Sequence, residues 1–170
     1  MRYEIGEYVV YGNNGICQVQ DIANPGFSGV DKEKMYYVLE PLNTKGSRIY
    51  SPVDNSKVMM RSVMDEEQAE KLIEEIPLIE ELWITNDKMR EERYKEAMVT
   101  GEPVEWVKII KTLYLRGKDR ERQGKKITAT DERYLKQAED SLYGELGFAL
   151  GKEKAEMESY ITDRIRRQKI

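Results

Sequence analysis

The chemistry open to this chain rests on its charged side chains, because the sequence contains no histidine and only one cysteine, Cys17. Histidine is the commonest general base and belongs to Ser-His-Asp, Cys-His and HExxH sites, so these active sites are excluded. A single cysteine also excludes an intramolecular disulfide and a cysteine-rich zinc site. No P-loop, GxGxxG or GxSxG motif occurs. We therefore expect a binding protein without a cofactor, and a carboxylate-metal nuclease is the enzymatic alternative.

Basic side chains are concentrated in one segment of a weakly acidic protein. Residues 106–126 hold eight basic and two acidic groups, whereas residues 65–105 hold five basic and fourteen acidic ones. The basic residues of the first segment are Lys108, Lys111, Arg116, Lys118, Arg120, Arg122, Lys125 and Lys126. On one face they would neutralise phosphates without reading sequence, and the alternative is a solvated helix face balanced by acidic neighbours.

The first 64 residues show the period of two that is typical of β-strands. Short runs of β-branched and aromatic residues are separated by turn clusters such as GNNG at 12–15 and NTKG at 43–46. Five short strands in this length predict a small, strongly bent Tudor-like or SH3-like β-barrel, whose closure protects the sheet edges. Cys17 falls in one of the strands and is expected to be a small buried hydrophobe.

From Asp65 onward the apolar residues recur at helical spacing. Acidic residues after Asp65, a proline at 103 and the TATD sequence at 128–131 are typical of helix starts. The pattern predicts a bundle of four or five helices. The fold class is therefore α+β, with a β-domain at 1–64 and a helical domain at 65–170.

The aromatic residues of the helical half divide into two groups. Trp106, Tyr94 and Tyr114 lie at helical spacing with apolar residues, so we expect them in the core. Trp83 stands between Leu82 and Ile84, a context that favours a core position as well. The alternative is an exposed aromatic that unstacks a base step.

Nothing in the sequence indicates a membrane protein. No apolar run approaches the roughly 20 residues that span a bilayer. The opening MRYEIGEYVVYG alternates polar and apolar residues instead of forming a signal-peptide core. We expect a cytoplasmic protein with no membrane partner.

Ordered motifs extend over nearly the whole chain. IGEYVVY at 5–11, followed by NGI at 14–16, resembles the VGDxVVYPxHG signature of the CarD family of bacterial transcription regulators. Gly12 stands in place of the usual proline and Asn14 in place of the usual histidine. Further matches in the family's order are YVL at 37–39, IYSP at 49–52, RYK at 93–95, LYLR at 113–116, GKKIT at 124–128, AE at 138–139 and LYGEL at 142–146. Each motif is weak alone, but their order is specific.

The resemblance implies a division of labour between the two halves. The Tudor-like domain of the family grips the RNA polymerase β subunit, and the helical domain contacts promoter DNA at the upstream edge of the transcription bubble, which stabilises the open complex. A similar N-terminal module occurs in the transcription-repair coupling helicase, but the helical half here favours the stand-alone regulator. The family leads us to expect a monomer. A protein-only adaptor on the polymerase, dominated by the acidic segment 65–105, is the alternative.

Candidate contact residues follow from these patterns. Arg48 and Tyr50 alternate with Ile49 on a strand that ends at Pro52, which suits an edge strand lying beside the polymerase, although the same residues also blunt a solvent-facing edge. One branch of the family has a wedge tryptophan at the position of Arg90, and Trp83 lies seven residues upstream. The residues that we expect to contact DNA are Trp83, Arg90, Arg93, Lys95, Arg116, Lys125 and Lys126.

Overall fold

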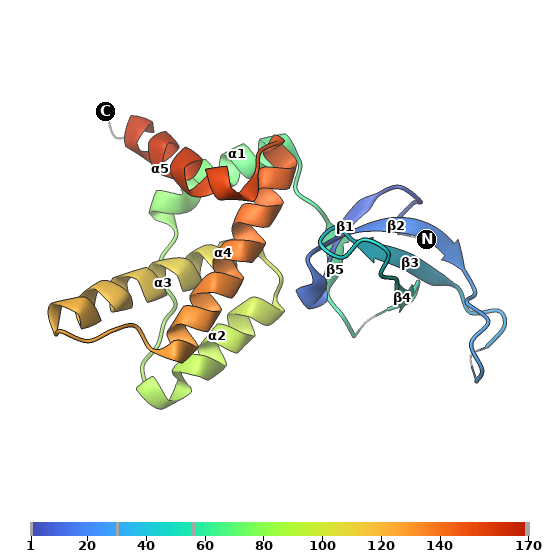
Figure 1. Ribbon diagram of the computed structural model, residues 1–170, viewed down its shortest axis with the longest axis horizontal. Helices are drawn as coiled ribbons and strands as arrows, with labels where there is room; N and C mark the ends of the chain where they lie inside the picture. Colours follow the sequence, from blue (N-terminus) through green and yellow to red (C-terminus); the bar gives the residue numbers. More distant parts are fainter. Residues whose placement is uncertain (1, 30, 56, 169–170) are drawn as a thin grey trace. The chain divides into compact units, whose positions relative to one another are not determined.

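The computed structural model describes residues 2–29, 31–55 and 57–168 of the chain. It divides into two compact units, Met1–Val63 and Met64–Ile170. The first contains an antiparallel sheet and the second contains five α-helices (Figure 1). The expected α+β class, with a Tudor-like β-module before a helical half, is confirmed. No helix in the described part of the chain is long and apolar enough to cross a membrane.

The first unit is built from five short strands. They are β1 (Tyr8–Tyr11), β2 (Ile16–Ala23), β3 (Tyr36–Pro41), β4 (Ile49–Pro52) and β5 (Met60–Ser62), with the 3-10 turn η1 (Gly12–Asn14) after β1. All their ladders are antiparallel, and the strand order is β4-β3-β2-β1-β5. The register shifts between Val19 and Asp21, which bends the long strand β2. The ladder therefore places β4 and β5 at its two edges.

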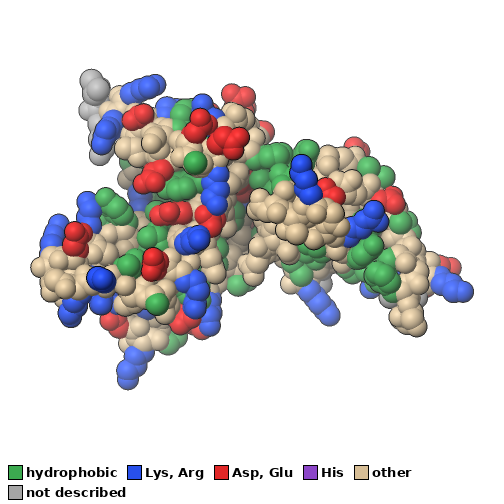
Figure 2. All heavy atoms as spheres, viewed as in Figure 1, with side chains coloured by type: hydrophobic (Ala, Val, Ile, Leu, Met, Phe, Trp, Pro, Cys, Tyr) green, Lys and Arg blue, Asp and Glu red, His purple; other side chains and the backbone are tan. Residues whose placement is uncertain are grey.

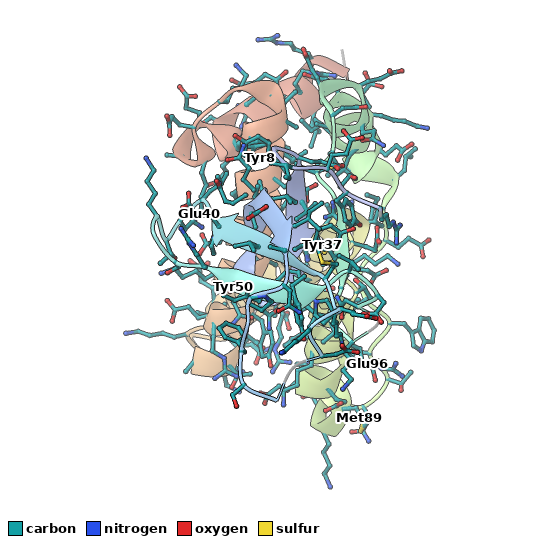
Figure 3. All side chains as sticks on the ribbon, turned by 90° about the vertical axis from the view of Figure 1, so that its right-hand side faces the viewer. Tyr8, Tyr37, Glu40, Tyr50, Met89 and Glu96 are labelled. Carbon is teal, nitrogen blue, oxygen red and sulfur yellow. The ribbon has the colours of Figure 1, made fainter. Side chains whose placement is uncertain are left out.

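Alternate strand residues form the core of the β-unit. Its buried members are Tyr3, Val9, Tyr11, Cys17, Val19, Tyr37 and Leu39. Tyr37, labelled in Figure 3, accepts hydrogen bonds from the backbone N–H groups of Arg2 and Tyr3 on its hydroxyl, at 3.0 and 3.2 Å. Its ring meets Tyr3 edge-on with centroids 5.7 Å apart. The chain's first residues are thus fixed to the sheet, and Cys17 is buried as predicted.

Gly12 explains one departure from the family signature. Its φ is +49°, a left-handed conformation that strains every residue except glycine. A Cβ at this position would lie 2.9 Å from Cγ1 of Val58. Proline, the usual family residue, fixes φ near −65° and could not adopt this backbone.

The second unit contains α1 (Glu66–Glu75), α2 (Arg90–Val99), α3 (Pro103–Arg122), α4 (Ala129–Leu150) and α5 (Met157–Gln168), with 3-10 turns η2 (Ile76–Leu78), η3 (Asp87–Met89) and η4 (Lys154–Glu156). The expected helix starts are confirmed in detail. Asp65 caps α1 in a capping box with Gln68, and the Thr128 hydroxyl accepts the N–H of Asp131 at the start of α4. These contacts satisfy backbone donors that the first helical turn leaves free.

The long helices α3 and α4 pack along each other, and the shorter helices complete the core (Figure 1). Trp106 and Tyr94 are buried in it, as their spacing predicted. Tyr114 is not: 57% of its surface is exposed, so its prediction as a core residue is wrong. It follows Leu113 by one residue, which turns it about 100° away from the buried face. Nζ of Lys118 covers its ring instead, 4.7 Å from the centroid.

Candidate functional site

The β4 edge presents the residues that the sequence suggested for a protein contact. Ser51 is buried and Ile49 packs against the core, so Tyr50 lies on the opposite face of the strand (Figure 3). Arg48 is exposed immediately before β4, and Pro52 ends it. The structure therefore places all three predicted residues at one edge of the sheet.

Phe27, which the sequence reasoning missed, joins this edge from the connection between β2 and β3. Its ring meets Tyr50 edge-on with centroids 5.0 Å apart, while 51% of its surface stays exposed. The connection is fixed at its base by Asn24, whose Nδ2 donates to the carbonyls of Asp31 and Lys34 at 2.7 and 2.8 Å. A lone phenylalanine among glycine, proline and serine gives no periodic signal, so only the fold reveals its position.

Residues 79–86, here named the Trp83 segment, connect η2 with η3. Leu82 and Ile84 pack against the helical core, and Trp83 between them is 81% exposed. In an extended chain successive side chains point to opposite sides. The favoured prediction of Trp83 as a core residue is therefore wrong, and its aromatic face is open to solvent.

Helix α3 holds the Trp83 segment in place. The backbone N–H of Leu82 donates to Oγ1 of Thr112 at 2.9 Å. Nζ of Lys111 donates to the carbonyl oxygens of Ile76 and Ile79, the latter at 2.6 Å. Burial lowers the pKa of Lys111, and the nearby carboxylate of Glu81 opposes this shift. Lys111, one of the eight cations of the basic segment, therefore stabilises the fold through these two hydrogen bonds.

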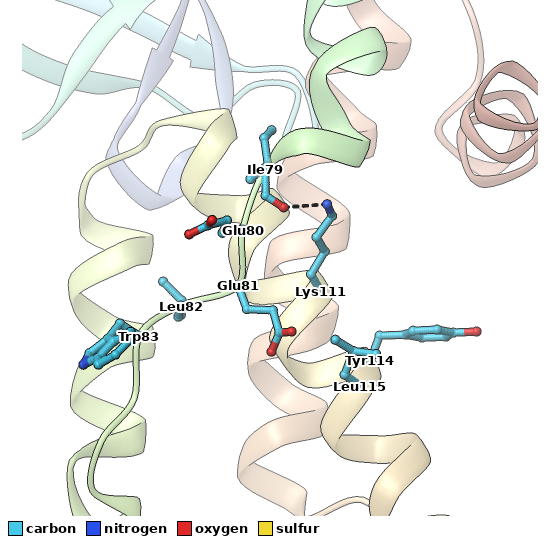
Figure 4. Close-up of a pocket in the computed structure, with 8 residues that line it drawn as sticks. All are labelled: Ile79, Glu80, Glu81, Leu82, Trp83, Lys111, Tyr114 and Leu115. Carbon is cyan, nitrogen blue, oxygen red and sulfur yellow. Dashed lines mark hydrogen bonds between the residues drawn. The ribbon is translucent and has the colours of Figure 1, made fainter. Parts of the chain in front are cut away.

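A hollow of about 680 Å³ lies between the Trp83 segment and α3 (Figure 4). Its walls are Ile79, Glu80, Glu81, Leu82, Trp83, Lys111, Tyr114 and Leu115. In the close-up the Trp83 and Tyr114 rings point away from each other, so they do not enclose a common ligand position. The hollow is lined by aliphatic side chains, two carboxylates, the ammonium group of Lys111 and the two aromatic residues.

Lys125 and Lys126 lie exposed in the connection 123–128 between α3 and α4, here named the basic loop. The loop is tight: the N–H of Lys125 donates to the carbonyl of Arg120 at 2.8 Å, and Nε of Arg120 donates to the carbonyl of Lys126 at 2.8 Å. Gly124, with φ of +75°, supplies the required left-handed residue. Arg120 is thereby used to shape the loop that presents the two lysines.

Arg93 and Lys95 lie exposed on α2. Each has an acidic neighbour on the same helix: Arg93 lies 3.1 Å from Glu96, and Nζ of Lys95 lies 4.0 Å from Glu91. Such exposed pairs are weak, so both cations remain available to an anionic partner. Glu91 also meets Arg133 at 3.1 Å, which brings α2 beside the first turns of α4. In Figure 2 the basic side chains of the helical unit are interspersed with acidic ones.

Arg90 and Arg116, also predicted to contact DNA, pair with side chains of the helical unit. Nε of Arg90 lies 3.1 Å from Oδ1 of Asp87, and its NH1 donates to the Tyr94 hydroxyl at 3.1 Å. Nε of Arg116 lies 3.1 Å from Oδ2 of Asp131, a carboxylate that is 3% exposed. In the sequence Asp131 can be recognised only as part of a helix-start motif. Nothing in the sequence pattern predicts that its side chain is buried.

Metal-binding groups do not assemble in the described residues. Among residues 2–29, 31–55 and 57–168, no group of three or more histidine, cysteine or acidic side chains could hold a metal ion. Burial raises the pKa of the Cys17 thiol to about 11, which keeps it in the protonated form. The structure thus presents one aromatic sheet edge on the first unit, and exposed basic and aromatic side chains on α2, the Trp83 segment and the basic loop of the second.

Comparison with known families gives a match in each of the two units. Residues 3–64 match the CarD-like/TRCF RID domain, and residues 77–162 match the CarD C-terminal domain. The chain belongs to the CarD family, and it is an RNA polymerase-interacting transcription regulator. The first of these domains implies binding to the polymerase β subunit. A search of curated proteins finds no match.

Proposed function

We propose that the protein bridges RNA polymerase and promoter DNA and thereby stabilises the open complex. The N-terminal unit binds the polymerase β subunit, and the helical unit contacts DNA at the upstream edge of the transcription bubble. Trp83 carries this proposal: its exposed ring stands on a segment that α3 holds in place. Exposing a large aromatic side chain to water is unfavourable in free energy. Proteins use exposed aromatic side chains to stack on bases or to unstack a base step.

The β4 edge is the proposed polymerase contact. Because β4 ends the ladder, it can lie beside or pair with a strand of the partner. Arg48 and Tyr50 flank this edge, Pro52 limits its length, and Phe27 adds an aromatic anchor on the same side. Aromatic residues are enriched in protein interfaces, and tyrosine is among the residues that contribute most binding energy there.

The basic loop and α2 are the proposed phosphate contacts. Lys125, Lys126, Arg93 and Lys95 are exposed, and α2 lies beside the start of α4, which directly follows the basic loop. Lysine and arginine side chains that contact phosphates give affinity without sequence readout. We infer that the protein acts in the cytoplasm, where a bacterial RNA polymerase works, and that it acts as a monomer.

A protein-only adaptor is the second candidate. Glu80 and Glu81 adjoin Trp83, and two carboxylates there disfavour phosphates. If these charges dominate, Trp83 contacts a protein partner and no DNA.

Open-complex lifetime with the matched polymerase distinguishes the two candidates. We would compare the full chain with Trp83→Ala and with the double variant Lys125→Glu/Lys126→Glu. Lys71→Glu/Lys152→Glu is the matched control, because it makes the same change in net charge at exposed positions on α1 and after α4.

The bridging function predicts that the wild type and the control prolong the lifetime, that both test variants do so less, and that added salt weakens the effect. Equal polymerase binding and an equal lifetime for all variants would instead establish the adaptor. Phe27→Ala changes only the β-unit. If this variant binds the polymerase less tightly, the polymerase contact is assigned to the β-unit.

A further inference from the structure

Five side chains from four elements form a closed polar network in the helical unit. The Tyr94 hydroxyl donates to Oδ1 of Asp131 at 3.1 Å and accepts a hydrogen bond from NH1 of Arg90. Arg90 pairs with Asp87, and NH1 of Arg116 lies 3.6 Å from the same Asp87 carboxylate. Arg116 then returns to Asp131 at 3.1 Å. The network therefore connects η3, α2, α3 and the first turn of α4.

The two arginines of this network have their charges compensated inside the protein. Two arginines face two aspartates, and the Arg90 and Arg116 side chains are only 21% and 22% exposed. A guanidinium released to a phosphate would leave Asp131 buried without its cation. An unpaired buried charge is strongly unfavourable, so Arg116 is a poor donor to DNA. The Asp87 partner of Arg90 is exposed, and Arg90 is held in the network by its hydrogen bond to the hydroxyl of buried Tyr94 as well.

The network also lies next to every proposed DNA-contacting element. Asp87 directly follows the Trp83 segment, and Asp131 follows the basic loop by three residues. Tyr94 lies on α2 between Arg93 and Lys95. Changing the network would therefore shift the Trp83 segment, α2 and the basic loop relative to one another.

We propose that this network sets the spacing between Trp83, α2 and the basic loop, and that Arg90 and Arg116 are positioning residues rather than phosphate contacts. This inference rests on the proposed DNA contact for its functional meaning. The effect of the network on the mobility of these segments does not depend on DNA. It can therefore be measured on the free protein.

Arg116→Met and the double variant Arg116→Met/Asp131→Asn test the proposal. The single variant leaves a buried carboxylate without its cation, whereas the double variant removes both charges and keeps an acceptor for Tyr94. A positioning network predicts rescue: the single variant shortens the open-complex lifetime by about ten-fold, and the double variant restores most of it. A phosphate contact predicts no rescue, because the cation is absent from both.

Two further measurements separate positioning from other causes. Backbone hydrogen exchange of free protein should rise by about ten-fold in the basic loop and near residues 84–90 for the single variant only. The slope of DNA affinity against salt should stay unchanged, whereas a lost phosphate contact lowers it by about one. Met157→Ala is the control for stability, because Met157 is buried in α5 away from the network. It should lower the melting temperature and leave the lifetime unchanged.

A reduced salt slope without rescue would show that Arg116 binds phosphate and would overturn the proposal. So would an equal loss of lifetime for Met157→Ala, because stability alone would then explain the effect. If hydrogen exchange follows the prediction while Lys125→Glu/Lys126→Glu has no effect on promoter DNA, the network stands and the proposed DNA function fails.

Discussion

The backbone N–H of Leu82 lies 2.9 Å from Oγ1 of Thr112, which in turn donates to the carbonyl of Lys108 at 2.7 Å. One hydroxyl thus joins the Trp83 segment to α3 and uses both of its hydrogen-bonding roles. Thr112 is buried, so water cannot replace it easily. The orientation of Trp83 depends on this side chain, although the two residues are far apart in the sequence.

Thr112→Val should loosen the Trp83 segment. Valine has nearly the same shape but leaves the Leu82 N–H without its acceptor, which costs about 1 to 3 kcal/mol in the free energy of unfolding. Hydrogen exchange at the Leu82 backbone N–H should accelerate. Thr112→Ser keeps the hydroxyl and should behave as the wild type. Unchanged exchange in the valine variant would show that packing of Leu82 alone holds the segment.

Phe27→Ala should weaken polymerase binding by about ten-fold, the loss typical of an aromatic anchor in an interface. Its ring is half exposed, so the melting temperature should change little. Ile5→Ala is the control, because Ile5 is also an exposed apolar residue of the β-unit. Titration of labelled protein with polymerase core enzyme measures the affinity. Equal losses for both variants would mean that Phe27 has no special role.

Much of the fold could be predicted because its signals are local. The alternation in residues 1–64 and the caps at Asp65 and Thr128 depend on neighbours within a few positions, and the structure confirms them. Tyr114 shows the limit of such reasoning. The helical spacing of Tyr114 did not show that the buried face of α3 ends at Leu113. The extent of this face depends on which other helices pack against α3.

The candidate site was less predictable because it depends on contacts between distant segments. Lys125 and Lys126 are exposed as a charge count suggests, but Arg90 and Arg116 look the same in the sequence and are paired internally. Arg116 pairs with Asp131 on another helix, so neither charge nor spacing reveals this pairing, whereas Arg90 pairs with Asp87 only three residues earlier. Trp83 shows the same limit, because its exposure follows from Leu82 facing the core.

Gly12→Ala should destabilise the β-unit. Alanine is strained at φ of +49°, and its Cβ would meet Val58 at 2.9 Å, so we expect a loss of about 1 to 3 kcal/mol in the free energy of unfolding. Gly117→Ala is the opposite control, because this glycine lies within α3 with nothing within 4 Å of an added Cβ. It should stabilise the helical unit by about 0.5 to 1 kcal/mol. Urea denaturation measures both. Equal stability of Gly12→Ala and wild type would contradict the assigned backbone strain.

Alkaline pH should destabilise the helical unit as the pH rises above about 10. Burial raises the pKa of Tyr94 and of Tyr143 from 10.0 to about 12. The folded state therefore keeps both hydroxyls protonated at pH values where the unfolded chain loses them. Their contribution is fully present below pH 10 and is lost as the pH rises toward about 12, with up to about 3 kcal/mol for each group.

Tyr143→Phe should reduce this loss, because Tyr94 is then the one of these two tyrosines that still links proton release with unfolding. Urea denaturation between pH 9 and 11.5 should give a shallower fall of unfolding free energy with pH than the wild type shows. Met157→Ala serves as the control, because Met157 is a buried residue of α5 that does not titrate. It should lower stability by a similar amount at every pH and leave the slope unchanged. The same slope in wild type and Tyr143→Phe would show that Tyr143 ionises equally easily in the folded and unfolded chains.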